Sequence, residues 1–291
     1  MTARRLTGPE IAAMRRRLPS AFRRPLGEQV LARGSWAVAV FAVGYLLWRF
    51  DMTPWRLAEG FSQIGGILAL MVPPSPREFL PEILKGLAET VAMAFLGTLL
   101  AALVALPLGF LGANNVNTNP VAHFLVRRVF DVFRAVPALI WALIFVRAVG
   151  LGPLAGVLAI FASDVAALAK LYAEAIENTD RRAREGVRAA GGGNVLAIRF
   201  GLVPAVLPVM LSQALYFFES NVRSAAILGI VGAGGIGQQL SERVRLFAWD
   251  QVAFIIILFL VTVALIDFGS RWLRRRLMGA GLRAETVGQP G

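Results

Sequence analysis

The chain has 291 residues, 57% of them hydrophobic, and a mean hydropathy of +0.64. Soluble domains are about 45–50% apolar, so this composition indicates an integral membrane protein. Only 16% of residues are charged, yet the net charge is +12. A pI near 11.5 is also typical of nucleic-acid-binding proteins, but the long apolar stretches argue against that function. The lack of cysteine excludes disulfides and thiolate metal sites, and the single histidine, His123, excludes histidine clusters and most catalytic triads.

Residues 1–34 are predicted to form a basic cytoplasmic tail, because they are rich in arginine and hold only Glu10 and Glu28 as acids. The run IAAMRRRL is typical of a short amphipathic helix on the membrane surface, and a disordered tail explains it equally well. Residues 35–79 are predicted to hold the first transmembrane helix, Trp36 to Phe50, and an outer loop. That helix starts late for a signal peptide, so we interpret it as a retained anchor.

Residues 51–79 contain many glycines and prolines. The piece from Phe61 to Val72 is interrupted by glycines and shorter than the roughly 20 residues of a span, so an interfacial or re-entrant segment is expected there. A second span is predicted from Thr90 to Gly112, with a kink at Pro107. The run GANNVNTNP that follows, residues 112–120, is typical of a loop.

Four more spans are predicted downstream. They are Ala135 to Val149, Leu154 to Leu171, Phe200 to Phe218 and Gln251 to Phe268. In the mixed segment before the first of them, the spacing allows Asp131 to pair locally with Arg127 or Arg128 on a helix, and His123 is interpreted as a loop residue. The sequence therefore predicts an all-α integral membrane fold with about six transmembrane helices. With both termini in the cytoplasm, the arginine clusters lie inside, as the positive-inside rule requires.

The stretch from Glu185 to Pro204, EGVRAAGGGNVLAIRFGLVP, is polar and basic at its start. It carries Arg188 and Arg199 as well as Glu185, so it does not belong inside a bilayer. Glycines permit a sharp turn of the backbone. We therefore predict a short helix, a break at the glycines and a second short helix that returns the chain to the membrane.

This stretch resembles the cytoplasmic coupling loop of ABC importer permeases. The matching residues are Glu185-Gly186-Val187, Gly191 and Val203-Pro204. The departures are Gly186 and Val187 where the family usually has alanines, Gly201 where isoleucine is usual, and Val203 in place of leucine. Further runs are similar to the phosphonate-type permease subunit: EAIEN (174–178), RFGLVPAVLP (199–208), FFESNVRSAAILGIVGAGGIG (217–237) and RAVPALIWALIF (134–145). The resemblance extends from about Leu80 to Leu273.

The resemblance implies a type I ABC importer permease fold. Its core would be residues 80–273, with a coupling segment at 174–199 and a cytoplasmic tail at 274–291. It implies a translocation subunit in the bacterial cytoplasmic (inner) membrane, where the protein works as a homodimer. Its expected partners are an ABC ATPase dimer, an external substrate-binding protein and membrane lipid, and no contact with nucleic acid is expected. The residues assigned to ATPase coupling are Glu185, Gly186, Arg188, Gly191, Gly193 and Pro204.

No catalytic residue, metal or cofactor is expected in this chain. It lacks the phosphate-binding loop motif G-x-x-x-x-G-K-[ST], so ATP and Mg²⁺ would be bound by the partner ATPase. The letters Gly232-x-Gly234-x-x-Gly237 match a dinucleotide fingerprint, but no βαβ unit surrounds them. These glycines are expected to allow close helix packing or a bend, and in the resembling family the region lies beside the translocation path.

Charged and polar residues precede the glycines. Glu219 and Arg223 are spaced to pair on a helix, and such a pair would be either functional or purely structural. Asn221, Arg223 and Ser224 would suit an anionic substrate such as a phosphonate. The residues predicted for the translocation path or gate are Glu219, Asn221, Arg223, Ser224, Gly232, Gly234 and Gly235.

Three other functions remain open at this point. The chain would also suit the permease of an ABC importer for another substrate class. A lipid-acting membrane enzyme would have to rely on residues such as Ser163 and Asp164, which form no convergent set. A secondary transporter would favour internal repeats, and none is visible. Phosphonate, phosphite and phosphate are not distinguished by the residues.

Overall fold

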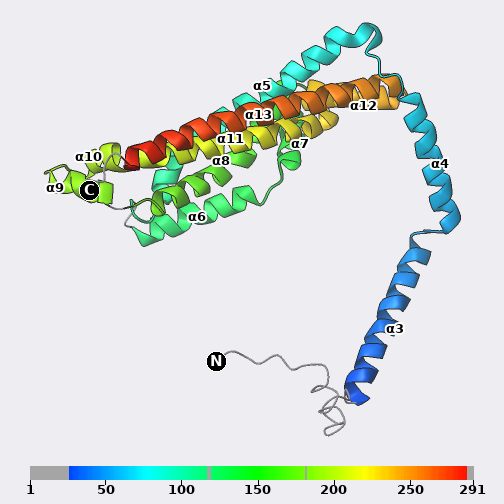
Figure 1. Cartoon of the computed structure of the whole chain (residues 1–291), viewed down its shortest axis with the longest axis horizontal. Helices are drawn as coiled ribbons and strands as arrows, with labels where there is room; N and C mark the ends of the chain where they lie inside the picture. The colour runs from blue at the N-terminus through cyan, green and yellow to red at the C-terminus, as the bar shows by residue number, and fades with distance from the viewer. Residues whose placement is uncertain (1–25, 117–118, 181, 287–291) are drawn as a thin grey trace, which may run out of the picture. The chain divides into compact units, whose positions relative to one another are not determined.

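The computed structural model describes residues 26–116, 119–180 and 182–286, and every regular element in them is a helix (Figure 1). Most of the predicted basic tail, including IAAMRRRL, lies outside the described residues. The chain divides into two compact units, residues 1–69 and residues 70–291.

The first unit holds two helices, α3 (Leu26–Arg49) and α4 (Pro54–Leu70). The predicted first span, except its last residue Phe50, lies in α3, whose described side chains are all exposed. α3 is not among the described helices that are long and apolar enough to cross a membrane. The prediction that glycines interrupt the next segment is wrong, because α4 is continuous through them. One glycine costs a helix only about 1 kcal/mol. The start of α4 also has the Thr53 hydroxyl, which accepts the backbone N–H of Arg56.

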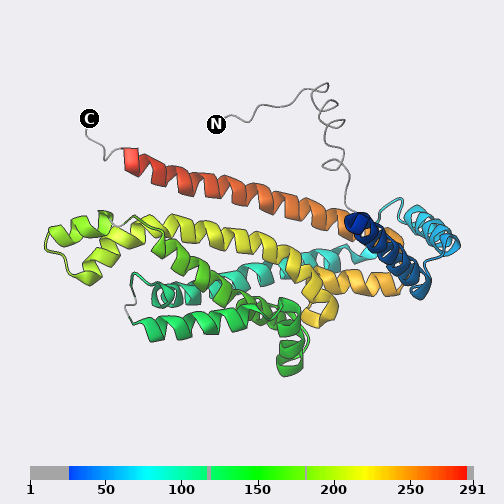
Figure 2. The same cartoon turned by 90° about the horizontal axis from the view of Figure 1, so that it is seen from below.

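The second unit is a bundle of helices. In chain order these are η1 (Arg77–Phe79), α5 (Leu80–Gly112), α6 (Pro120–Arg134), α7 (Ala138–Val149), α8 (Pro153–Glu177), α9 (Arg182–Ala189), α10 (Asn194–Leu196), η2 (Ala197–Leu202), α11 (Val203–Leu228), η3 (Gly229–Ala233), α12 (Gly235–Arg245) and α13 (Trp249–Thr286). Figures 1 and 2 show α5, α8, α11 and α13 running along the same axis, with α9 and α10 at one end and α12 toward the other.

Four helices among the described residues are long and apolar enough to cross a membrane. They cover Arg77–Gly112, Pro153–Glu177, Asn194–Ala233 and Trp249–Leu277. They contain the predicted second, fourth, fifth and last spans, and the first of them continues through Pro107. The bent pair of α6 and α7 raises the number to five. The all-α membrane fold is thus confirmed, with six as an approximate count.

The predicted third span, Ala135 to Val149, is wrong as a single helix. The chain bends by 80° between α6 and α7. Proline disfavours helical backbone in the residue before it, and Pro137 sits at the bend with φ −61° and ψ 146°. α7 alone extends only about 18 Å, too short for a hydrocarbon core of about 30 Å. The pair nevertheless connects both ends of the bundle, because α6 is bonded to Glu177 and the turn after α7 to Gly232.

Small side chains bring α5 and α8 close together. A Cβ atom on Gly97 would lie 2.7 Å from Ile160, and one on Gly109 would lie 2.7 Å from Tyr172. Buried alanines fill the remaining contact; they include Ala101, Ala105, Ala166, Ala169 and Ala173. Close backbone approach through small residues is how helices associate in lipid, where burial of apolar surface supplies no driving force.

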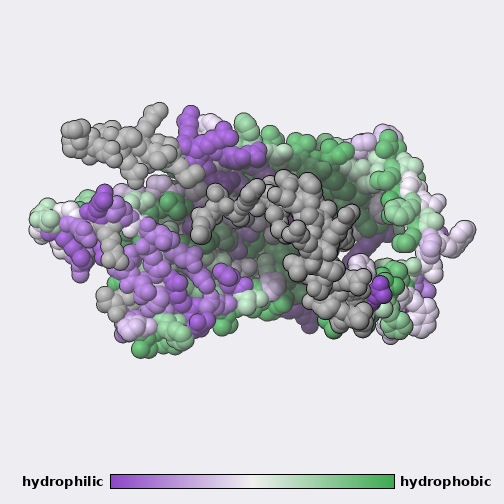
Figure 3. Space-filling view, turned by 60° about the horizontal axis from the view of Figure 1, so that its bottom comes forward, coloured by the Kyte–Doolittle hydropathy of each residue, from purple (hydrophilic) through white to green (hydrophobic). Residues whose placement is uncertain are grey.

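Polar residues are unevenly distributed over the second unit. In the view of Figure 3, hydrophilic residues gather over the end that carries α9 and α10. Exposed arginines at this end include Arg182 and Arg188, whereas large apolar side chains such as Leu103 and Leu260 are exposed along the bundle. An apolar shell with one basic end is the pattern of a protein that crosses a membrane.

Candidate functional site

The candidate coupling segment is a short helix followed by a glycine turn. α9 ends at Ala189, and the N–H groups of Gly191 and Gly192 bond back to the carbonyls of Arg188 and Val187 at 2.9 and 3.0 Å. Gly191 has φ +85°, which side chains disfavour. The chain then re-enters helix at α10. The predicted helix, break and second helix are therefore all present.

Several residues of α9 are exposed to solvent. Glu185, Gly186 and Arg188 are exposed, and among the described side chains none forms an ion pair with Glu185. Arg188 spans the turn by donating to Asn194 Oδ1 at 2.6 Å. Gly193 is the residue before α10, with φ −70°. Pro204 is the second residue of α11, which follows η2 without a break.

A buried polar cluster lies between α5, α8 and α11. Asn221 donates from Nδ2 to Thr98 Oγ1 at 2.8 Å and to Asp164 Oδ2 at 2.5 Å. All three side chains are buried, and Thr98 in turn donates to the carbonyl of Ala94. Ionisable groups inside a membrane bundle require such partners. Nothing in the sequence connects Asn221 with Asp164, but in the structure the two side chains are hydrogen-bonded to each other.

Replacing Asn221 by leucine is expected to lower stability by about 1–3 kcal/mol, because Asp164 loses a buried hydrogen-bond donor. The melting temperature of the purified protein measures this loss. Ser224→Ala is the control, since that hydroxyl donates only to the carbonyl of Ser220 in its own helix, at 3.2 Å. Unchanged melting of the Asn221 variant would contradict a role for the cluster in stability.

Two ion pairs join α11 to α13. Glu219 accepts from Arg274 at 2.5 Å, and Arg223 lies 3.4 Å from Asp267. The predicted Glu219–Arg223 pair does not form. The reason is that α13 passes alongside α11 and offers each of them an opposite charge from another helix. Glu219 is buried, whereas Arg223 is exposed.

The glycine-rich run forms a bend at the start of α12. Gly232, Gly234 and Gly235 all have positive φ, between +75° and +101°. The first two free N–H groups of α12 already have partners on α5: Gly235 donates to Glu89 Oε2 at 3.2 Å and Ile236 to Thr90 Oγ1 at 2.8 Å. A carboxylate and a hydroxyl thus occupy the helix N-terminus, where a nucleotide-binding motif would hold phosphate.

Within the described ranges, no group of three or more His, Asp or Glu side chains is arranged to hold a metal ion.

Residues 105–279, more than half of the chain, match the model of the binding-protein-dependent transport system inner membrane component. The chain belongs to this family. It is therefore a multi-pass protein of the inner membrane and a transport permease, and the resemblance to ABC importer permeases of the phosphonate type is confirmed.

Two relatives are similar over most of the chain. The phosphite transport system permease protein PtxC of Stutzerimonas stutzeri is 34% identical over 252 residues, covering 87% of this chain and 89% of that protein. The phosphate-import permease protein PhnE of Mycolicibacterium smegmatis is 39% identical over 213 residues, covering 73% of this chain but only 40% of that longer protein.

A solved structure shares the fold. It is titled as inward-facing conformations of the MetNI methionine ABC transporter, and it aligns with a TM-score of 0.62 at 23% identity. The alignment covers 70% of this chain and 99% of that one. This likeness supports the ABC importer permease fold.

The structure brings some of the predicted site residues of this permease together and separates others. The coupling residues on α9 and its turn share one segment. The path residues on α11 face different partners, and the glycines lie at the start of α12. Sequence reasoning missed Glu177, although it stands in the run EAIEN that carried part of the resemblance.

Two smaller predictions need correction. His123 is not in a loop: it lies in α6, with Nε2 3.8 Å from Glu177 Oε1. Asp131 pairs with Arg128 at 3.2 Å, as expected, but its shorter contact, at 2.8 Å, is to Lys170 on α8. Arg127 pairs with Glu177 instead of Asp131. For Asp131 a contact between helices is added to the contact within α6, and for Arg127 a contact between helices replaces it.

Proposed function

We propose that this permease forms, as a homodimer, the pathway of an ATP-driven importer for phosphonates or related phosphorus oxyanions. A separate ATPase would drive it through the Glu185–Gly191 loop. The observation that carries the proposal is the exposed helix α9 with its left-handed glycine turn. The names of PtxC and PhnE, which concern phosphite and phosphate, support the substrate class.

A coupling role suits the local geometry of α9. Glu185 and Arg188 are exposed charges on a short helix, available to a protein partner. The turn at Gly191 lets the chain reverse direction within a few residues, so that α9 and α10 form a compact helical hairpin. In this proposal Gly186 leaves room for a close partner, Gly193 and Pro204 set the return of the chain, and an ATPase groove receives the helix.

The path would run beside α11. Arg223 is exposed and its contact with Asp267 is long, so an oxyanion has a guanidinium to meet there. Asn221, Ser224 and Glu219 lie within the same turns, and Gly232, Gly234 and Gly235 are the candidate gate. We place the core at residues 80–273 and both termini in the cytoplasm. The remaining partners in the proposal are a second copy of this chain, an external binding protein and lipid.

Co-purification and uptake test the proposal. Two differently tagged copies of this chain are expressed with a candidate ATPase and a candidate binding protein from the same organism. Capture of one tag is expected to bring down the other copy and the ATPase. The complex in proteoliposomes should then take up phosphite, phosphate or methylphosphonate only with ATP. Uptake by the purified chain alone would overturn the proposal, and so would the absence of any ATPase in the captured complex.

Replacing Gly191 by valine is expected to reduce ATP-driven uptake by about tenfold or more, because a left-handed backbone costs a branched side chain about 1–3 kcal/mol. The matched control is Ala190→Val, since Ala190 is the exposed preceding residue and does not have positive φ. Uptake and ATP hydrolysis are measured in the same vesicles. Equal uptake by the two variants would argue against a role for the turn geometry.

A further inference from the structure

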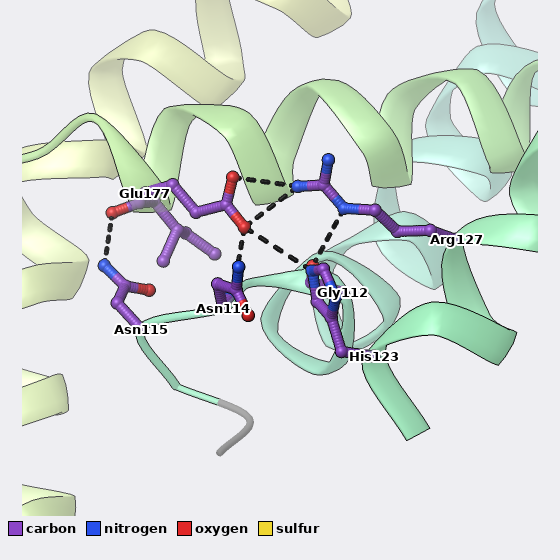
Figure 4. Close-up of polar contacts among 7 residues, drawn as sticks. Gly112, Asn114, Asn115, His123, Arg127 and Glu177 are labelled. Carbon is purple, nitrogen blue, oxygen red and sulfur yellow. Dashed lines mark hydrogen bonds and ion pairs between the residues drawn. The ribbon is translucent and has the colours of Figure 1, made fainter. Parts of the chain in front are cut away.

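The last residue of α8 joins three segments. Glu177 accepts two hydrogen bonds from Arg127 Nη2, at 2.9 Å to Oε1 and 2.8 Å to Oε2 (Figure 4). Its Oε1 also accepts the backbone N–H of Asn114 at 2.8 Å. The glutamate and the arginine are both half-buried. One carboxylate therefore holds α6 and the loop after α5 against the end of α8.

That loop is held at further points. Asn115 donates to the carbonyl of Ile176 at 2.9 Å, and Arg127 Nε lies 3.4 Å from the carbonyl of Gly112. Arg184, on α9, donates to the carbonyl of Asn115 at 3.0 Å. The loop is thus bonded on one side to α8 and on the other to the candidate coupling helix.

A second ion pair between the same two helices provides a comparison. Lys170 on α8 and Asp131 on α6 lie 2.8 Å apart. Neither makes a hydrogen bond to the loop or to α9 among the described side chains. A simple need to fix α6 on α8 would be met by either pair. Only the Glu177 pair adds contacts to the loop that α9 also binds.

We propose that Glu177 is a positioning residue that makes α5, α6 and α8 follow the displacement of α9. The inference rests on the coupling role proposed for α9. The chemistry calls for a carboxylate, because three donor contacts converge on its two oxygens. A glutamine at this position would keep one carbonyl oxygen and turn an amide N–H₂ toward the Arg127 guanidinium. Arg127 on α6 would then lose its acceptors on Glu177. The loop would keep the bond from Asn115 to the carbonyl of Ile176 and the bond from Arg184 on α9.

Glu177→Gln is tested in the full complex with its ATPase and binding protein, reconstituted in proteoliposomes with phosphite, phosphate and methylphosphonate as probes. The number of substrate molecules taken up per ATP hydrolysed is expected to fall at least about fivefold, as for the loss of a typical coupling energy. Asp131→Asn, the matched control, should leave this ratio unchanged. A purely structural role would lower the amount of complex and both rates together, leaving the ratio intact.

Arg184→Ala removes the tie between α9 and the loop from the other side. It is expected to lower the same ratio, and the double variant should be no worse than the single ones, because both remove one connection. Should Glu177→Gln fail to assemble, the Arg184 variant alone decides. An unchanged ratio in the Arg184 variant, or an equal fall in Asp131→Asn, overturns the inference.

The two levels of the proposal fail differently. If Gly191→Val lowers the ratio and the Glu177 and Arg184 variants do not, α9 is the coupling helix and only the role of Glu177 is wrong. If no ATPase is captured with the chain, the proposed function itself is wrong.

Discussion

Gly237→Ala is expected to remove nearly all folded protein from the membrane. A Cβ atom at this position would lie 1.8 Å from the carbonyl oxygen of Ala226 and 3.1 Å from the Cα of Gly229. Both atoms belong to the backbone of the preceding turns, so no side chain can rotate away. Overpacking usually costs about 1–3 kcal/mol, and a forced backbone shift raises the loss to about 4 kcal/mol or more.

The amount of monodisperse protein after detergent extraction and its melting temperature measure this effect. Gly269→Ala is the control, because a Cβ there meets nothing within 4 Å and alanine favours a helix by about 1 kcal/mol over glycine. The control should melt at or above the temperature of the parent protein. If Gly237→Ala melts within a few degrees of the parent protein, the close backbone contact between α11 and the start of α12 is contradicted.

Arg274→Ala is expected to destabilise the protein by about 3–5 kcal/mol, because it leaves Glu219 buried without its cation. Exposed Arg275 provides the control, and Arg275→Ala should have little effect. Adding Glu219→Gln to the Arg274 variant should recover part of the loss, since the uncompensated charge disappears. Thermal melting of all four proteins gives the result, and equal losses for the two arginine variants would refute the pairing.

Features with a short range in sequence were the ones that could be predicted. Apolar length alone located α5, α8, α11 and α13, because a membrane demands about 20 residues per crossing. The turn at Gly191 followed from the glycines and the surrounding charges. The composition also identified a membrane protein before any element was placed.

Contacts between distant segments could not be predicted. Helical spacing pointed to Glu219–Arg223 and Arg127–Asp131, but the actual partners lie on α13 and α8, dozens of residues away in the chain. The bend of the chain at Pro137, between α6 and α7, could not be predicted because hydropathy carries no information on the direction of a helix. The glycines of α4 led to a wrong prediction of a break, since a helix tolerates single glycines at a modest cost.

The helical stretch Asn194–Ala233 connects the candidate coupling turn with the glycine bend, and it has a consequence for handling the protein. Its 40 residues extend about 60 Å at 1.5 Å per residue, roughly twice the hydrocarbon thickness. The stretch is therefore longer than one perpendicular crossing of the hydrocarbon core. Apolar side chains are exposed near both ends, at Val195 and Ile230. Exposed apolar surface favours association, so solubilising agents that strip away whatever covers these two ends should leave an aggregation-prone protein.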